Sequence, residues 1–348
     1  MKPTIYLIII AMAMIACSRE EELTPSMKDV DRVATQIDLS KPLVKFLYET
    51  YNCGILYEFD FTLDFAYLAS SRNIVYNWQM VNLEKLDSSD VDFALGFLED
   101  NVFQYFKDGI ESEGSLYQSD YFLNQLPFKV LVCREVNTTN GFLFDPLTLS
   151  DSRATDNGTG VLHSIGNDHT FVFGVDRRTI LASSKNFHKY RNDNFFLFMV
   201  YVMEKHHMYD LILSQFFETS IQYFGENIGD MYKNEGYIVD EYGLVDKEWF
   251  LNRGFVDARY FYGREGLPDV TIGDLTIEKA IKGIFYFPSS NEDFVNSYLN
   301  ELIHTNSSKL DTYPGIIKEK FIILIEQFME WGVDIVAFNP ELNSLYNE

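Results

Sequence analysis

Apolar residues return at the helical spacing of three or four positions in several stretches of the chain. The segment Asp90–Lys107 (DVDFALGFLEDNVFQYFK) has this spacing and carries aspartates at its start, so we expect an α-helix there. Serine and asparagine residues before Glu292 are good N-caps, and they predict a helix from there to about His304. The other predicted helices are Pro42–Glu49, Thr276–Ile284 and Pro314–Trp331, the last of which ends at Gly332.

The most apolar stretch of the domain runs from Asn194 to Glu218 and reads NFFLFMVYVMEKHHMYDLILSQFFE. Its residues are apolar on nearly every side of a helical projection, which is typical of a helix that is buried all round. We therefore predict a central buried helix from Asn194 to about Thr219.

Short apolar runs rich in β-branched and aromatic residues predict strands between these helices. The predicted strands are Gly54–Phe59, Leu126–Cys133, Thr170–Val175 and Thr179–Ala182. Residues 75–86 fit a helix and a strand equally well. The segment Asn137–Asn167 is rich in Asn, Thr, Asp, Ser and Gly and predicts a long loop. Residues 220–270 are rich in aromatic residues and contain several glycines.

The N-terminus has the pattern of a secretory signal. Lys2 precedes an apolar run that is too short for a membrane span, and Met14–Cys17 resembles the lipobox of bacterial lipoproteins. Residues 1–16 are then a lipoprotein signal peptide, and Cys17 is the lipidated first residue. A plain signal peptide with a chance cysteine is the alternative. The acidic cluster after Cys17 resembles a surface-export signal, and residues 17–39 are expected to form a flexible tether.

Composition limits what the remaining domain, residues 40–348, can do. Lys and Arg number 28 against 52 Asp and Glu, a net charge of −24 that repels phosphate backbones, so nucleic-acid binding is not expected. At 47% hydrophobic and 16% aromatic, the chain can bury a large core. Cys53 and Cys133 lie in apolar, strand-like surroundings; two buried free thiols are favoured over a single bridge between them.

Met203–His207 (MEKHH) is one letter away from H-E-x-x-H. That motif places two histidine ligands of a zinc ion one helical turn apart, with a glutamate as general base. On local grounds a buried, hydrogen-bonded polar pair of Glu204 and His207 is favoured over a zinc site. The zinc interpretation gains from Glu292, because gluzincins take their third ligand from a glutamate on a later helix, and Glu292 stands 85 residues after His207.

The chain resembles the substrate import-associated zinc metallohydrolases, zinc-binding metallopeptidase lipoproteins of Bacteroidetes. The resemblance covers nearly the whole mature chain, and the helix pair is its most specific part. The features that carry it are the lipobox with its acidic leader, Tyr51–Phe59 (YNCGILYEF), Leu126–Cys133, MEKHH at 203–207, Arg253–Val256, Glu292–Val295 (EDFV) and the exit Trp331–Asp334 (WGVD).

The resemblance implies a role for each matching residue. His207 would be the second histidine ligand, Glu204 the general base and Glu292 the carboxylate ligand. Met203 stands in the place of the first histidine, and a thioether is a poor ligand for Zn²⁺. Asn296 stands where the family's Glu-Asp-Phe-Ala-Glu ends in glutamate, so a supporting contact to the metal ligands is also altered.

Few other residues offer a replacement ligand. His206 follows the motif but points about 100° away from His207 on a regular helix, so it would contribute only through a local distortion. Tyr286 could donate to an oxyanion in a zincin, although packing explains it as well. His188 is a further candidate that could approach from elsewhere in the chain. His304 lies too far along its helix from Glu292, and His163 and His169 are expected to serve at the surface.

The expected fold is α+β and zincin-like, of the gluzincin type: a small mixed sheet packs on the motif helix, and a helical C-terminal subdomain supplies Glu292. The implied activity is zinc-dependent hydrolysis of a peptide or protein, impaired or lost through Met203. The alternative is a non-catalytic lipoprotein that binds a peptide or glycan. In both cases the resemblance implies an outer-membrane lipoprotein, exposed at the cell surface beside a TonB-dependent importer and its binding lipoprotein.

Overall fold

The computed structural model describes most of the predicted domain. The residues described are 32–66, 81–112, 114–138, 160–167, 169–239, 245–256, 259–260, 270–272, 275–277 and 285–346. The predicted signal peptide, the lipidation site at Cys17 and the first part of the tether lie outside these residues. Among the helices in the described ranges, none has the length and apolar character needed to cross a membrane.

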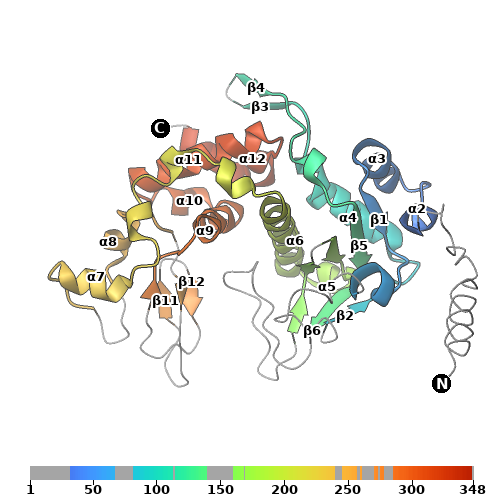
Figure 1. The fold of residues 1–348 in the computed structure, drawn as a ribbon, viewed down its shortest axis with the longest axis horizontal. Coiled ribbons are helices and arrows are strands. Elements are labelled where there is room, and N and C mark those ends of the chain that lie inside the picture. The colour runs from blue at the N-terminus through green and yellow to red at the C-terminus, as the bar shows by residue number, and fades with distance from the viewer. Residues whose placement is uncertain are drawn as a thin grey trace, which may run out of the picture.

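A four-stranded mixed sheet forms the first half of the fold (Figure 1). Its strand order is β1 (Gly54–Leu56), β5 (Lys129–Cys133), β9 (Thr170–Gly174) and β8 (Ser164–Gly166). The first three strands are parallel and β8 is antiparallel to β9. All four are buried along their length, which agrees with the continuous apolar runs of β5 and β9.

Smaller sheets surround this one. A three-stranded antiparallel sheet is made of β2 (Val81–Glu84), β6 (Glu135–Thr138) and β7 (Gly160–Leu162). The predicted loop 137–167 is therefore strand at both of its ends, and its middle lies outside the described residues. The two-stranded sheets pair β3 (Ile110–Ser112) with β4 (Ser115–Tyr117), β10 (Arg259–Tyr260) with β13 (Phe285–Tyr286) and β11 (Val270–Ile272) with β12 (Leu275–Ile277).

The ordered domain begins before the predicted boundary at residue 40. Helix α2 (Arg32–Gln36) packs beside β1, and the Arg32 guanidinium pairs with both oxygens of Asp64. The Asp64 side chain is fully buried, and Lys129 lies 3.8 Å from it. A buried carboxylate needs such cationic partners, so Arg32, which was predicted as part of the tether, is held against the sheet.

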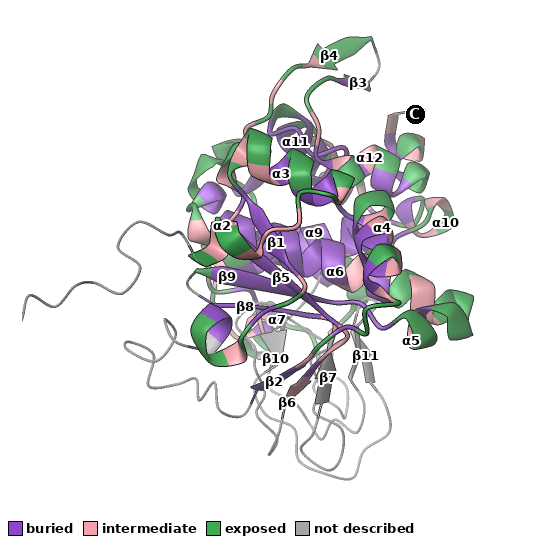
Figure 2. Ribbon diagram, turned by 90° about the vertical axis from the view of Figure 1, so that its right-hand side faces the viewer, coloured by how far each residue is buried: buried purple, intermediate pink, exposed green. Residues whose placement is uncertain are grey.

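Helix α6 (Ser184–Lys205) lies between the sheet and the C-terminal helices (Figure 1). Phe198 places its ring centroid 5.0 Å from those of Phe171 and Phe173 on β9. On its other side α6 packs against α9 (Asn291–His304). Every residue from Asn194 to Met203 is buried, and the buried colour of α6, α9 and the main strands in Figure 2 marks this core. The prediction of a helix buried on all sides is confirmed.

Both predicted ends of α6 were wrong: the helix starts ten residues before Asn194 and ends fourteen residues before Thr219. The helix starts at Ser184 because the Ser183 hydroxyl caps it by accepting from the Asn186 N–H at 3.1 Å. It stops at Lys205, and the chain turns at His207, whose φ of 53° is left-handed. The residues that follow form short 3₁₀ turns instead of a continued helix.

Other predicted elements also differ from the structure. Thr179–Ala182, predicted as a strand, lies in helix α5 (Arg177–Ala182), because the Asp176 carboxylate accepts from the Arg178 and Thr179 N–H groups and caps a first turn. Thr276 and Ile277, predicted to begin a helix, belong to β12; the rest of that segment lies outside the described residues. Helix α4 (Val91–Asn101) ends before Lys107.

The last two predicted helices match the structure closely. Helix α9 begins behind Ser290, whose hydroxyl accepts from the Asp293 N–H at 3.2 Å. Helix α11 (Gly315–Glu330) is followed by Gly332 and the short helix α12 (Ile335–Phe338). Arg191 of α6 donates to the Phe338 carbonyl at 2.6 Å and stacks 3.7 Å from the centroid of its ring, which ties the chain's last turns to the central helix.

The structure also settles the two cysteines of the domain. Cys53 and Cys133 are both buried and both free, as predicted. Burial raises the pKa of the Cys53 thiol to about 12, and it raises the pKa of the Cys133 thiol as well. Overall the architecture is α+β, as the sequence predicts.

A buried lysine supports the junction of the two halves. Lys320 of α11 is 3% exposed, and its ammonium donates to the Phe216 carbonyl. Its Nζ lies 5.2 Å from the ring centroid of Phe216 and 5.3 Å from that of Phe294. Burial lowers the pKa of Lys320 to about 8, although the charges of Glu218 and Glu319 act in the opposite direction. The predicted Arg-Gly-Phe segment lies beside it, since a Cβ on Gly254 would come within 2.7 Å of Lys320 Cε.

We expect the free energy of unfolding to rise between about pH 8 and pH 10.5 because of Lys320. In this window the unfolded chain carries a proton on the lysine that the folded protein has lost. The full shift corresponds to about 3 kcal/mol. Denaturant unfolding at pH 7.5 and pH 10 measures it, and Lys320→Met should remove most of the rise whereas Lys45→Met, at an exposed position, should keep it. Equal pH slopes for the wild type and Lys320→Met would contradict this assignment.

Gly332 should tolerate no side chain. Its φ is 82°, and a Cβ built on it would lie 2.2 Å from the Ser119 carbonyl oxygen. Gly332→Ala is expected to lower the free energy of unfolding by about 3 kcal/mol or more. Gly315→Ala is the matched control, because no atom lies within 4 Å of its Cβ position; it should change stability by less than about 0.5 kcal/mol. Similar denaturation midpoints for the two variants would show that this contact is relieved at little cost.

Candidate functional site

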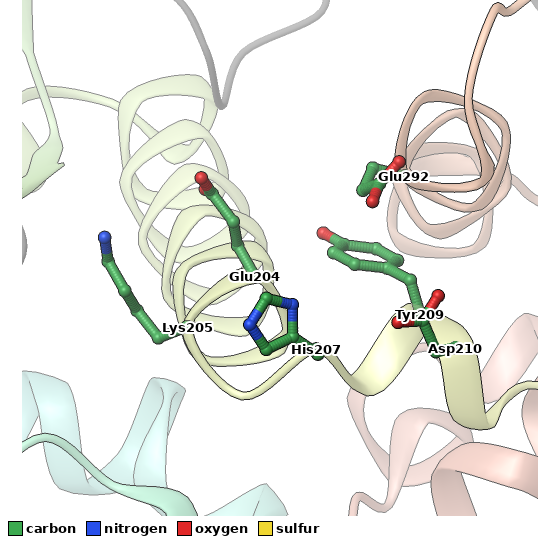
Figure 3. A pocket seen from close by; sticks show the side chains of 6 residues that line it. All are labelled: Glu204, Lys205, His207, Tyr209, Asp210 and Glu292. Carbon is green, nitrogen blue, oxygen red and sulfur yellow. The ribbon is translucent and has the colours of Figure 1, made fainter.

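A pocket lies where the end of α6 faces the start of α9. Its volume is about 340 Å³. Six side chains line it (Figure 3): Glu204, Lys205, His207, Tyr209, Asp210 and Glu292. The three residues singled out by the resemblance, Glu204, His207 and Glu292, are therefore brought together on one cavity, although Glu292 is far from the other two in sequence.

The lining residues lie at or just beyond the end of α6 and at the start of α9. Glu204 sits in the last turn of α6, and His207 occupies the left-handed turn that follows it. Tyr209 and Asp210 belong to the 3₁₀ turn Met208–Leu211. Glu292 is in the first turn of α9, where a carboxylate is favoured by the helix dipole. Because α6 ends at Lys205, His207 is not presented from the same helical face as residue 203.

Tyr209 joins the two helices at the base of the pocket. Its side chain is buried, and its hydroxyl donates to Asn296 Oδ1 of α9 at 2.8 Å. Burial raises the pKa of Tyr209 well above its usual range; the hydrogen bond to Asn296 opposes this shift, and the nearby charges of Glu204 and Glu292 add to it. The phenol is therefore neutral, and Asn296, the residue that departs from the family pattern, serves as its acceptor.

Met203 is not part of the pocket. Its side chain is 0% exposed within the hydrophobic core, and it is absent from the residues that line the cavity. The neighbouring Glu204 is exposed and does line the cavity. A ligand at position 203 would thus have to leave the core. Residue 203 therefore does not face the pocket that Glu204 and His207 line.

The donors present do not make up a catalytic zinc centre. Such a centre takes three protein ligands and leaves one position for water. Within the described ranges, no three His, Cys, Asp or Glu side chains come together closely enough to hold a metal ion. His207 and Glu292 remain as candidate ligands on opposite sides of the pocket; in Figure 3 Glu204 lies on the same side as His207, and the Tyr209 ring lies between them and Glu292. We therefore derive no catalytic step through zinc.

None of the other histidines supplies the missing donor. His206 ends α6 and interacts with the Gln125 backbone; burial lowers its pKa, as does His207, while the Gln125 contact raises it. His163 pairs with Asp193 and is half-buried, so its predicted surface role was wrong. His304 Nδ1 lies 2.8 Å from the Asn300 carbonyl oxygen, at the far end of α9. His188 packs edge-on against Phe187. His169 also lies outside the pocket lining.

Sequence reasoning missed three residues of the pocket: Lys205, Tyr209 and Asp210. Tyr209 and Asp210 lie within the stretch predicted as continuous helix, where they would have faced other directions. Left-handed turns are usually predicted from a glycine, but here the left-handed residue is His207. The sequence therefore contains no indication of the turn that places Tyr209 and Asp210 beside the pocket. Tyr286, considered as an oxyanion donor, lies in β13 and does not line the pocket.

No protein-family model, curated protein or solved structure matches the chain. The assignment of the candidate site therefore depends on the geometry of its residues alone.

Replacing Met203 by histidine should not create a zinc site. The imidazole would enter the apolar core in a buried position without a described partner, which costs about 2–4 kcal/mol of stability. Met203→Leu keeps the volume and should cost less than about 1.5 kcal/mol. Thermal unfolding with and without added Zn²⁺ measures both effects. Zinc-dependent stabilisation of Met203→His, absent from Met203→Leu, would show that residue 203 does reach the pocket.

Proposed function

We propose that the protein is a metallohydrolase-like lipoprotein of the outer membrane whose pocket binds a ligand instead of hydrolysing it. The fold is zincin-like in this proposal: the mixed sheet, the motif helix α6 and the later helix α9 correspond to the layers that the resemblance implies. The observation that carries it is the meeting of Glu204, His207 and Glu292 on one pocket while Met203 lies in the core.

Two features favour binding over hydrolysis, and a third marks the turn at His207 as a functional position. The position of the first histidine is apolar and buried, so an activated water would lack one of its metal's ligands. Asn296 is engaged by Tyr209 and is not a carboxylate that could orient a ligand. His207 adopts a left-handed backbone, which for a residue other than glycine costs about 1–2 kcal/mol. Strain of this kind is retained where surrounding structure demands it, and it is common at functional sites.

The proposed setting follows from the N-terminal sequence and the resemblance. A lipid on Cys17 would anchor the chain to the outer membrane, with the domain at the cell surface. The ligand would be a peptide or a glycan destined for a TonB-dependent importer and its nutrient-binding lipoprotein. The acidic surface, with a net charge of −24, supports a partner or ligand that is not itself strongly anionic.

An impaired zinc hydrolase is the second candidate. It is favoured by the retention of a glutamate, a histidine and a second glutamate around the same cavity, which are the residues that such an enzyme would use as base and ligands. The two candidates differ in metal content and in the role of Glu204.

Metal analysis of the purified protein separates them. We expect well under one zinc per chain after dialysis against micromolar Zn²⁺, and no cleavage of a casein substrate above that of a heat-treated sample, because the donor set lacks a third ligand. Glu204→Gln should then change nothing. One zinc per chain that is lost in Glu292→Gln, together with cleavage that is lost in Glu204→Gln, would replace this proposal by the hydrolase.

A further inference from the structure

We propose that Glu84 and Glu135 form a proton-sharing pair, which tightens the β2–β6 sheet in acid and loosens it as the pH rises. This device is independent of the proposed function, because it lies in another part of the fold and involves no ligand. Three observations carry it: the register of the two strands, the single cation beside the pair, and a further carboxylate that adjoins both glutamates.

The strand register sets the two glutamates against each other. In the antiparallel ladder of β2 and β6, Glu84 is the direct partner of Glu135, and Leu83 is the direct partner of Val136. Leu83 and Val136 are buried, whereas both glutamates are half-buried. The apolar residues therefore share the inner face of the strand pair and the acids share the outer one. Like charges at directly opposite positions destabilise a strand pair.

Arg134 is the cation beside the pair among the described residues, and it serves Glu84 alone. Its Nη2 lies 2.5 Å from Glu84 Oε1. Its Nε is buried without an acceptor, so the guanidinium makes no second contact to a carboxylate through that atom. Apart from Glu84, the described side chain that hydrogen-bonds to Glu135 is the neutral amide of Asn137, at 3.5 Å. No described cation therefore pairs with Glu135 to hold it ionised.

Asp176 adds a third carboxylate beside the pair. It is 8% exposed, it caps α5, and its negative charge acts on both Glu84 and Glu135. Two neutral groups complete the described surroundings, the Cys133 thiol on β5 and the Tyr190 phenol on α6; burial raises the pKa of both. Three carboxylates thus face one arginine. Retaining a proton between the two glutamates relieves this excess of negative charge.

The pKa values of the two acids move in opposite directions, as a shared proton requires. Burial raises the pKa of Glu135, and the hydrogen bond with Glu84 and the charge of Asp176 add to this shift. The Asn137 contact opposes it. The hydrogen bond from Arg134 lowers the pKa of Glu84; burial opposes this shift and the hydrogen bond with Glu135 adds to it. The proton therefore resides on Glu135, which donates it to Glu84.

The direction of the pH effect follows from Glu135. A carboxyl group with a raised folded pKa stabilises the fold fully below its ordinary pKa of 4.5, and this contribution is lost as the pH rises through the raised value. Glu84 acts in the other window: its contribution is present above 4.5 and is lost as the pH falls through its lowered pKa. The sheet therefore loosens on the alkaline side of 4.5, when the proton passes to solvent and two negative charges face each other.

This loosening reaches the second hydrophobic cluster of the domain. Within the described residues β2 is an outer strand that pairs with β6 alone. Its Val81 and Leu83 side chains are buried in a cluster with Leu131 and Val172 of the main sheet. The glutamate pair therefore controls how firmly the small sheet, in which β2 and β6 run side by side in Figure 1, covers one face of the main sheet.

Carbon-13 titration of the glutamate side-chain carboxyls in the full chain tests the pair directly. Glu111 is the reference, because it is an exposed strand glutamate that stands opposite the neutral Leu116. The midpoint of Glu135 should lie above that of Glu111, and the midpoint of Glu84 should lie below it. A Glu135 midpoint equal to or below that of Glu111 would overturn the inference.

Amide hydrogen exchange, corrected for the intrinsic effect of pH, measures the consequence for the sheet. Between pH 5 and pH 8 the β2 amides should lose protection by about two- to fivefold, the cost of opposed like charges, whereas the β9 amides should not change. Glu135→Gln, whose amide can donate to Glu84 at every pH, should abolish this loss. Glu111→Gln is the matched control and should keep it. Equal loss in the wild type and Glu135→Gln, or no loss in the wild type, would also overturn the inference.

Discussion

The burial of α6 on all sides is the constraint on which the rest of the structure depends. From Asn194 to Met203 the helix meets the sheet on one side and α9 on the other, and each of its residues is buried. Even its polar residue obeys this rule, because Asn194 donates to the Gly174 carbonyl at 3.3 Å and accepts from Ser164. The functional side chains of a helix that is buried on all sides can reach solvent only near its ends.

This constraint explains why the pocket lies where it does. Glu204 is the first residue beyond the enclosed part of α6, and the turn at His207 brings Tyr209 and Asp210 back towards α9. Met203 belongs to the enclosed part, so its role is packing. The hydrogen bond from Tyr209 to Asn296 then links the turn after α6 to α9 beside the cavity. The pocket therefore forms at the position where the buried part of α6 ends.

The sequence correctly predicted the helices and strands whose positions depend on local features such as caps and apolar runs. Helices α9 and α11 were found because Ser290 caps the one and Gly332 follows the other, and strands β5 and β9 were found from their apolar runs. The ends of α6 were missed for two different reasons. Ser183 is a cap that could have been recognised, whereas the left-handed turn at His207 has no glycine or asparagine that would have indicated it. The pocket partners Tyr209 and Asp210 were missed with it.

The two thiols of the domain have a consequence for how the chain can fold. Cys53 and Cys133 are enclosed in the core, and burial holds both as protonated thiols, the form that neither attacks nor exchanges readily. The native structure of the described domain therefore requires no oxidant to complete it and has no disulfide that a reductant could open. With no covalent cross-link, the described fold is held by its apolar core together with its buried ion pairs and hydrogen bonds.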